Sequence, residues 1–270
     1  MNRRYARLES ADGERVYGEL VGGEAQILTA PPWSGGVPTG RSILGVDSDA
    51  MGGARRIAPV SPTKIVCVGR NYRAHASELG NEVPVEPLLF FKPPSSILDP
   101  YGAIELPPLE ISRRIDHEVE LGIILGQRVR RATPAQAVSA IFGCTIAGDI
   151  TARDLQKKDG QWTRAKGMDT FCPVGPVVVT GLAIDALTVE CRVNGQTRQS
   201  GSTADMIFPV PQLIAYISQV MTLEPGDLIL TGTPSGVGPL ESGDSLEMAI
   251  SGIGVLALRV IAPDAGASQA

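Results

Sequence analysis

The segment DHEVELGIILG, residues 116–126, decides the fold of this chain. It alternates polar and apolar side chains at first and then becomes apolar, which indicates a long β-strand that runs into a core. Because successive side chains of a strand point to opposite faces, Glu118 and Glu120 share one face, while His117 points the other way, into the core. The sequence therefore predicts two adjacent carboxylates on a strand that is otherwise apolar.

Short apolar runs separated by turn residues continue on both sides of this strand. A hairpin is predicted around Asn194-Gly195, and Thr133 followed by Pro134 marks the start of a helix. The further strands are expected at 64–69, 87–91, 144–151, 227–232, 244–251 and 255–261, and the further helices at 70–80 and 209–223. Strands outnumber helices, so we expect a β-rich α+β fold, a mixed sandwich or roll with a few covering helices.

The chain divides into three regions by composition. Residues 1–62 are predicted to form a small N-terminal β region with a turn at Asp12-Gly13, passing into Gly- and Pro-rich linker and loop from about residue 30. The main domain is expected to span 63–262. The polar end, 263–270, is predicted to be disordered.

The overall composition excludes several classes of protein. The 270 residues are 43% hydrophobic, enough for a substantial core, and the formal net charge of -5 leaves no basic patch for a nucleic acid. No apolar run is long enough for a membrane helix, and no signal peptide is recognisable. The four cysteines are far apart in apolar runs, so we expect buried thiols and a cytoplasmic protein.

The paired carboxylates Glu118 and Glu120 are candidate metal ligands. Side by side they repel each other unless a cation lies between them, and Asp149, at the end of the apolar run TIAGDI, could supply a third ligand. All-oxygen ligands favour Mg²⁺ or Mn²⁺, with Ca²⁺ as a substitute, over zinc. Three carboxylates would leave positions open for substrate. The same pattern also fits an edge strand with one solvated face.

Three other features carry candidate chemistry. His75 and Glu78 lie three residues apart on the predicted helix, so they share a face, as in a general base oriented by a carboxylate; an ordinary surface pair is the alternative. Lys166 is predicted in a loop, where it either stabilises an anionic substrate or is simply exposed. The turn 231–238 offers backbone amides and threonine hydroxyls to a carboxylate, or is only a tight turn.

Taken together, these segments resemble the fumarylacetoacetate hydrolase family. The matching segments occur in the family's order over roughly 63–260 and are VGRNYRAHASELG, FFKPPSS, IDHEVELGIILG, GDITARDLQ, TRAKGMDTFCPVGP and LILTGTPSGVG. The resemblance implies a mixed β-sandwich roll, usually as a homodimer. It also implies metal ligands at Glu118, Glu120 and Asp149, and a His75–Glu78 dyad on a short lid helix that orders over the substrate.

The resemblance extends to further residues and to the reaction. It places the family's lysine at Lys166 and its threonine at Thr231, and the other substrate-binding positions fall on Arg70, Tyr72, Arg153, Gln161, Gly232 and Thr233. Family members act on 2-oxo acids that carry a second carbonyl or carboxylate, by acylpyruvate hydrolysis, oxaloacetate decarboxylation or isomerisation of hydroxymuconate-type diacids such as 2-hydroxyhepta-2,4-diene-1,7-dioate. We expect C–C bond cleavage, because the His75–Glu78 pair is intact; isomerisation is the alternative.

Two readings from other classes stay open. A non-catalytic, metal-stabilised β protein that binds small acids would keep the carboxylates but would not need His75, Glu78 or Lys166. A serine hydrolase using Ser235 needs a histidine partner, and the chain has only two histidines. A serine hydrolase would also survive removal of metal.

Overall fold

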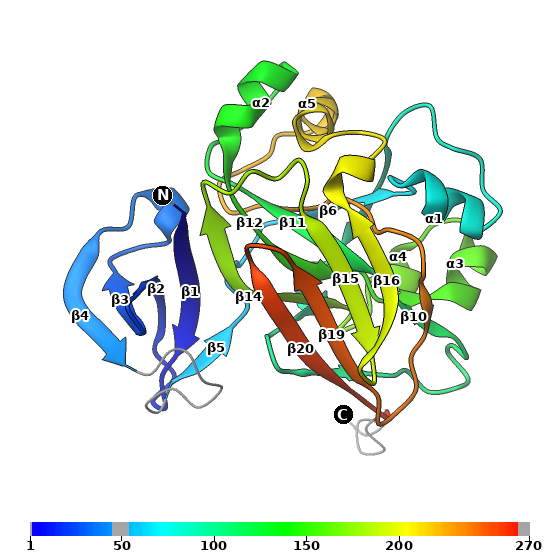
Figure 1. Ribbon diagram of the computed structural model, residues 1–270, viewed down its shortest axis with the longest axis horizontal. Helices are drawn as coiled ribbons and strands as arrows, with labels where there is room; N and C mark the ends of the chain where they lie inside the picture. Colours follow the sequence, from blue (N-terminus) through cyan, green and yellow to red (C-terminus); the bar gives the residue numbers. More distant parts are fainter. Residues whose placement is uncertain (1, 45–53, 264–270) are drawn as a thin grey trace.

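The computed structural model describes residues 2–44 and 54–263 and is built mainly of strands (Figure 1). The largest sheet crosses the whole molecule. In spatial order its main strands are β4 (Pro38–Leu44), β3 (Glu24–Leu28), β2 (Arg15–Val21), β1 (Arg3–Glu9), β14 (Cys172–Thr180), β12 (Ile141–Gly148), β11 (Val119–Leu125), β17 (Leu228–Leu230), β6 (Ile65–Gly69) and β7 (Leu88–Lys92). Two short strands extend it, since β5 (Arg55–Ile57) pairs with β1 and β8 (Ile97–Leu98) pairs with β14.

A second sheet packs against the first and closes the core. Its strands, in spatial order, are β16 (Gln196–Ser202), β15 (Thr188–Val193), β19 (Ser245–Ile250), β20 (Gly254–Ile261) and β9 (Ala103–Glu105). A small third sheet joins β13 (Thr151–Ala152), β10 (Ile115–His117) and β18 (Gly238–Pro239). All seven residues of β11 are buried, because this central strand is covered on both faces. The predicted β-rich sandwich architecture is confirmed.

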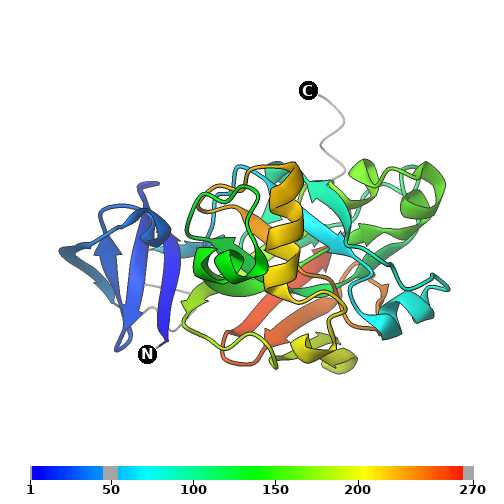
Figure 2. The same cartoon turned by 90° about the horizontal axis from the view of Figure 1, so that it is seen from above.

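Helices cover the sheets at two places. The helices α2 (Pro134–Ala140) and α5 (Val210–Val220) lie side by side in both views, at the top of Figure 1 (Figures 1 and 2). The short helices α1 (Arg73–Glu78), α3 (Arg153–Asp159) and α4 (Thr163–Lys166) gather on the side opposite the N-terminal strands. Single 3-10 turns occur at Pro32–Ser34, Pro94–Ser96 and Thr203–Asp205. None of the helices in the described ranges is long and apolar enough to cross a membrane.

Local sequence signals account for many element ends. Thr133 caps α2 in a capping box with Gln136, and Pro134 takes the first helical position, as predicted. The Asn194-Gly195 turn joins β15 to β16, and both residues have positive φ, the conformation that such hairpin turns demand. All four cysteines are free and buried, as predicted.

The segment predicted to be linker and loop contains two strands, so that prediction is wrong for 38–44 and 55–57. Proline begins β4, an edge strand, where its missing N–H removes no ladder hydrogen bond. Gly40 has φ +84° near a register shift between β3 and β4, which is the geometry of a bulge. Since β1 pairs with β14, the N-terminal strands continue the large sheet. The predicted disordered tail lies, from residue 264, outside the described residues.

The long strand predicted over 116–126 is interrupted at Glu118. The chain leaves the third sheet after His117 and enters the large sheet at Val119. At the break the side chain of Gln199 replaces a strand partner, because its Oε1 accepts a hydrogen bond from the Val119 amide at 3.0 Å. Glu118 therefore lies where two sheets meet.

Candidate active site

Three carboxylates meet where β11 and β12 pair. Val119 is opposite Gly148 in the register, and the Asp149 amide donates to the Glu118 carbonyl at 2.9 Å, so the two acidic residues are neighbours across the strands. Glu118, Glu120 and Asp149 are all buried, and each offers an oxygen within 4.8 Å of the others' oxygens. The spatial cluster expected from the sequence is present, and the alternative of a solvated edge strand is wrong.

Buried cations surround two of the three carboxylates. The Arg153 guanidinium donates to Glu118 at 2.5 Å, and the Lys166 ammonium donates to Glu118 at 3.0 Å and to Asp149 at 2.5 Å. On the other side of Asp149, the ammonium of Lys92 donates at 2.8 Å. Burial alone would raise the pKa of Glu118, but Lys166 and Arg153 outweigh it and hold that pKa well below its usual range.

Glu120 lacks such compensation. Its hydrogen bond within the protein comes from the Gly232 amide at 2.6 Å, and no cationic side chain of the described residues pairs with it. Burial, followed by the charges of Asp149 and Glu118, raises the pKa of Glu120 well above its ordinary value. A cation bound among the three oxygens would remove this repulsion, so the residues fit a divalent metal ion.

His75 stands over the cluster on α1. Its side chain is only 5% exposed, and burial lowers its pKa, so the neutral imidazole is favoured. The His75 Nδ1 lies 3.6 Å from Glu78 and has no hydrogen-bond partner among the residues that the structure describes. Glu78 instead accepts from the Gly236 amide at 3.0 and 3.1 Å, so the predicted pair shares a face but is not hydrogen bonded.

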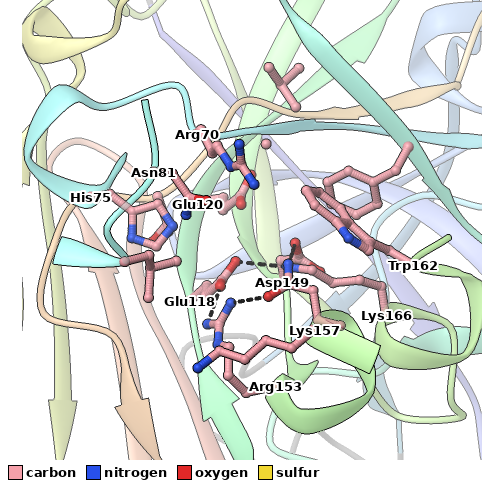
Figure 3. A pocket seen from close by; sticks show the side chains of 16 residues that line it. Arg70, His75, Asn81, Glu118, Glu120, Asp149, Arg153, Lys157, Trp162 and Lys166 are labelled. Carbon is pink, nitrogen blue, oxygen red and sulfur yellow. Dashed lines mark hydrogen bonds and ion pairs between the residues drawn. The ribbon is translucent and has the colours of Figure 1, made fainter. Parts of the chain in front are cut away.

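These groups line one pocket, with a volume of about 300 Å³ (Figure 3). That volume is at the low end of small-molecule sites. One wall is basic and comes from α3, and another is apolar, where Phe90 and Trp162 pack edge to face at 5.2 Å. Figure 3 shows His75 and Arg70 on one side of the carboxylates and Lys157 and Arg153 on the other.

Most of the expected site residues line this pocket: Arg70, His75, Glu118, Glu120, Asp149, Arg153, Lys166 and Thr233. Lys166 is buried in the last position of α4, so the prediction of a loop lysine, and the alternative of an exposed one, are wrong. Gly160 has a positive φ and turns the chain after α3, and the short helix Thr163–Lys166 follows.

Five expected residues lie beside the pocket rather than in its lining. The Thr231 hydroxyl donates to the Leu121 carbonyl, and Gly232 acts through its amide on Glu120. Tyr72 is buried against a neighbouring hollow, and its hydroxyl has no partner in the described part of the chain. Gln161 lines a separate hollow near Thr163. In this structure, Glu78 contacts the turn at Gly236 rather than the pocket.

Several residues of the site were not expected from the sequence. Gln156 lines the pocket and accepts from Arg153 at 2.6 Å, and Lys157 follows it. Lys92 ends the apolar strand LLFFK and is buried. A lysine at the end of an apolar strand indicates a buried acidic partner, because lysine is rarely buried unless its charge is paired. Trp162 and Phe90 could be found only from the fold, because they are distant in sequence.

Comparison with known proteins places these features in a family. The family described as Fumarylacetoacetate (FAA) hydrolase C-terminal matches residues 64–261. The chain is 51% identical over 198 residues to Oxaloacetate tautomerase FAHD1, mitochondrial, of Arabidopsis thaliana, covering 71% of this chain and 87% of that one. It is 51% identical over 197 residues to Oxaloacetate decarboxylase, mitochondrial, of Dictyostelium discoideum, covering 70% and 89%.

A solved structure extends the similarity to the N-terminal strands. The crystal structure of 2-hydroxyhepta-2,4-diene-1,7-dioate isomerase from Mycobacterium marinum matches with a TM-score of 0.85 and 41% identity, over 96% of this chain and 98% of that one. Because 96% of the chain lies inside the match, the similarity includes most of the region 1–62, where the sequence resemblance is loose.

Proposed function

The chain belongs to the fumarylacetoacetate hydrolase family and is an enzyme, and on that premise we propose that it is Mg²⁺- or Mn²⁺-dependent and cleaves a C–C bond of a small 2-oxo acid with a second carbonyl or carboxylate group. The observation that carries the proposal is the cluster of three buried carboxylates, one of them without an ion-pair partner among the described residues, in a small pocket with Lys166, Arg153 and a neutral His75. A metal-stabilised acid-binding protein would not need the lysine and histidine there.

Glu118, Glu120 and Asp149 are the residues that would hold the metal. When bound, a divalent cation supplies Lewis-acid polarisation of the 2-oxo acid. Two of the metal's proposed ligands are held in place before the metal binds. Arg153 and Lys166 donate hydrogen bonds to Glu118, and Lys92 and Lys166 donate hydrogen bonds to Asp149. Such pre-positioning lowers the cost of ordering the site around a substrate.

Lys166 and His75 have separate tasks in this proposal. Lys166 is held charged by Asp149 and Glu118, so its ammonium can stabilise negative charge that develops on the substrate. His75 is favoured in its neutral form, so it can take a proton from a water molecule or from carbon and return it later. Leu79, Phe90 and Trp162 help to exclude bulk water.

A panel assay tests the proposal. Acylpyruvates, oxaloacetate and hydroxymuconate-type diacids are incubated with the metal-loaded enzyme and with chelator-treated enzyme, and the products are identified by NMR. We expect pyruvate, with an acid or CO₂, from the best substrate, and no turnover in chelator. Turnover that survives complete removal of metal would contradict the metal dependence.

Isomerisation or tautomerisation of the same acids is the second candidate. The observation that favours it is the separation of 3.6 Å between His75 and Glu78, because a base that only moves a proton on carbon needs no carboxylate partner. In the panel this reaction gives a product of unchanged carbon number. If the substrate's original tautomer disappears and no pyruvate forms, the reaction is isomerisation rather than cleavage.

The homodimer, the cytoplasmic location and the lid movement of α1 stay predictions. Light scattering on the purified chain measures the first directly. A mass near twice 28.4 kDa is the expected result.

A further inference from the structure

The basic wall of the pocket carries one cation that the metal cluster does not use. Arg153, Gln156 and Lys157 line the pocket from α3. Positions i, i+3 and i+4 of a helix share a face, which explains why these three point the same way. Arg153 is bound to Glu118, Asp116 and Gln156, whereas no hydrogen bond or ion pair reaches the Lys157 ammonium from the described part of the chain.

The acidic residues of α3 are occupied elsewhere. Asp154 accepts from the Ser112 hydroxyl at 2.5 Å and from the Arg113 amide at 2.9 Å, and Asp159 pairs with Arg164. Lys157 is therefore left one helical turn from another cation, Arg153, an arrangement that destabilises a helix. The helix dipole favours a base in the last turn, but the adjacent Lys158 already provides one.

The charge of the pocket also favours a ligand with two negative charges. Among the described residues four cationic side chains line it against three carboxylates, so the cations outnumber the carboxylates by one. A divalent metal bound by the three carboxylates would raise this excess of positive charge to three. A substrate with a single carboxylate leaves two of these positive charges unbalanced, and a dianion leaves one.

Resting on the proposed function, we propose that Lys157 binds a second carboxylate of the substrate and so selects 2-oxo diacids over 2-oxo acids with a neutral far end. The first carboxylate and the oxo group lie at the metal cluster, and Lys157 is one helical turn, about 6 Å, along the wall from Arg153. The Gln156 oxygen already accepts from Arg153, and its amide nitrogen, to which no described residue is hydrogen bonded, lies on the same wall as a further donor. Lys157 is exposed at the pocket's edge, where it can meet a substrate as it enters.

The test compares two ligands that differ at the far end, where one has a carboxylate and the other has the neutral methyl ester of that carboxylate. Binding of 2-oxoglutarate and of its 5-methyl ester to the Mg²⁺-loaded protein is measured by calorimetry, for the wild type and for Lys157→Gln, Lys157→Arg and Lys158→Gln. Cleavage needs the second carbonyl or carboxylate carbon at C4, next to the carbon that follows the oxo group. In both ligands that carbon is C5, so affinity is measured without turnover.

We expect the wild type to bind the diacid more tightly than the ester. Lys157→Gln should weaken diacid binding by roughly three- to tenfold, the size of one partly exposed charge-assisted contact, and leave ester binding unchanged. Lys157→Arg should keep the preference, and Lys158→Gln should change neither affinity. Equal wild-type affinities, an equal loss for both ligands, or the same loss in Lys158→Gln would overturn the proposal. A preserved diacid preference together with an inactive panel assay would instead contradict the proposed function alone.

Discussion

Replacing Lys92 by methionine should destabilise the protein through the metal cluster. The ammonium of Lys92 is fully buried and donates to Asp149 at 2.8 Å, to the Ile150 carbonyl at 3.3 Å and to the Lys166 carbonyl. Methionine fills a similar volume, so the loss is electrostatic rather than a cavity. Breaking a buried ion pair costs about 3–5 kcal/mol, and because Asp149 keeps Lys166 as a partner, we expect a loss of about 3 kcal/mol in the absence of metal.

Urea unfolding in chelator, followed by circular dichroism, measures this loss. Saturating Mg²⁺ binds only the folded state and should stabilise both proteins. It should also reduce the difference in the free energy of unfolding between Lys92→Met and the wild type, because in the variant the bound cation replaces the missing positive charge beside Asp149. Lys158→Met, at an exposed position of α3, is the matched control and should change the free energy of unfolding by no more than about 0.5 kcal/mol. A loss under about 1 kcal/mol for Lys92→Met, or no recovery with Mg²⁺, would refute this reasoning.

The remaining predictions concern the metal, the base and the lid. Glu118→Ala should abolish Mg²⁺ and Mn²⁺ binding and with it activity, and unaltered Mn²⁺ binding in that variant would show the ligand assignment to be wrong. If hydrolysis is the reaction, His75→Ala should lower kcat by about 10²–10⁴-fold, and if it keeps near-full activity while Lys166→Ala is inactive, decarboxylation or isomerisation replaces hydrolysis. Because burial lowers the pKa of His75 from 6.5, the basic form persists as pH falls, so the acid limb of kcat should lie below pH 6.5 and disappear in His75→Ala; a limb above pH 7 would argue against His75 as the base. Hydrogen exchange over 71–86 should slow when oxalate and Mg²⁺ are added, and unchanged exchange at saturation would count against lid closure.

The local sequence predicts the main strands and the carboxylate cluster better than it predicts where the chain passes from one sheet to another. The alternation around Glu118 and Glu120 and the apolar run before Asp149 are local signals, so the carboxylate cluster could be predicted from them. The break between β10 and β11 could not, because it depends on Gln199, which is 80 residues away in sequence and reaches the Val119 amide from the second sheet. The strand at 38–44 was missed for a related reason: pairing with β3 outweighs the local preference of Pro38 and Gly40 for loops.

The candidate site shows the same limit. His75 and Lys166 were identified as single residues, but only the fold shows that Lys166 is buried between two carboxylates. Lys92 contributes from β7 through contacts that no spacing rule encodes. Gln156, not Gln161, faces the pocket, since it lies three residues after Arg153 on α3, whereas Gln161 follows the end of that helix.

The central claim, a catalytic divalent cation held by Glu118, Glu120 and Asp149, is tested most directly by titrating chelator-treated protein with Mn²⁺ and following bound metal and turnover in the same samples. Glu120→Gln, which keeps the shape of the side chain and removes the uncompensated charge, is measured beside the wild type. We expect one Mn²⁺ per chain, turnover that rises in proportion to bound metal, and binding weakened at least about tenfold in Glu120→Gln. Full turnover before any Mn²⁺ is added, or equal affinity in the two proteins, would contradict the claim.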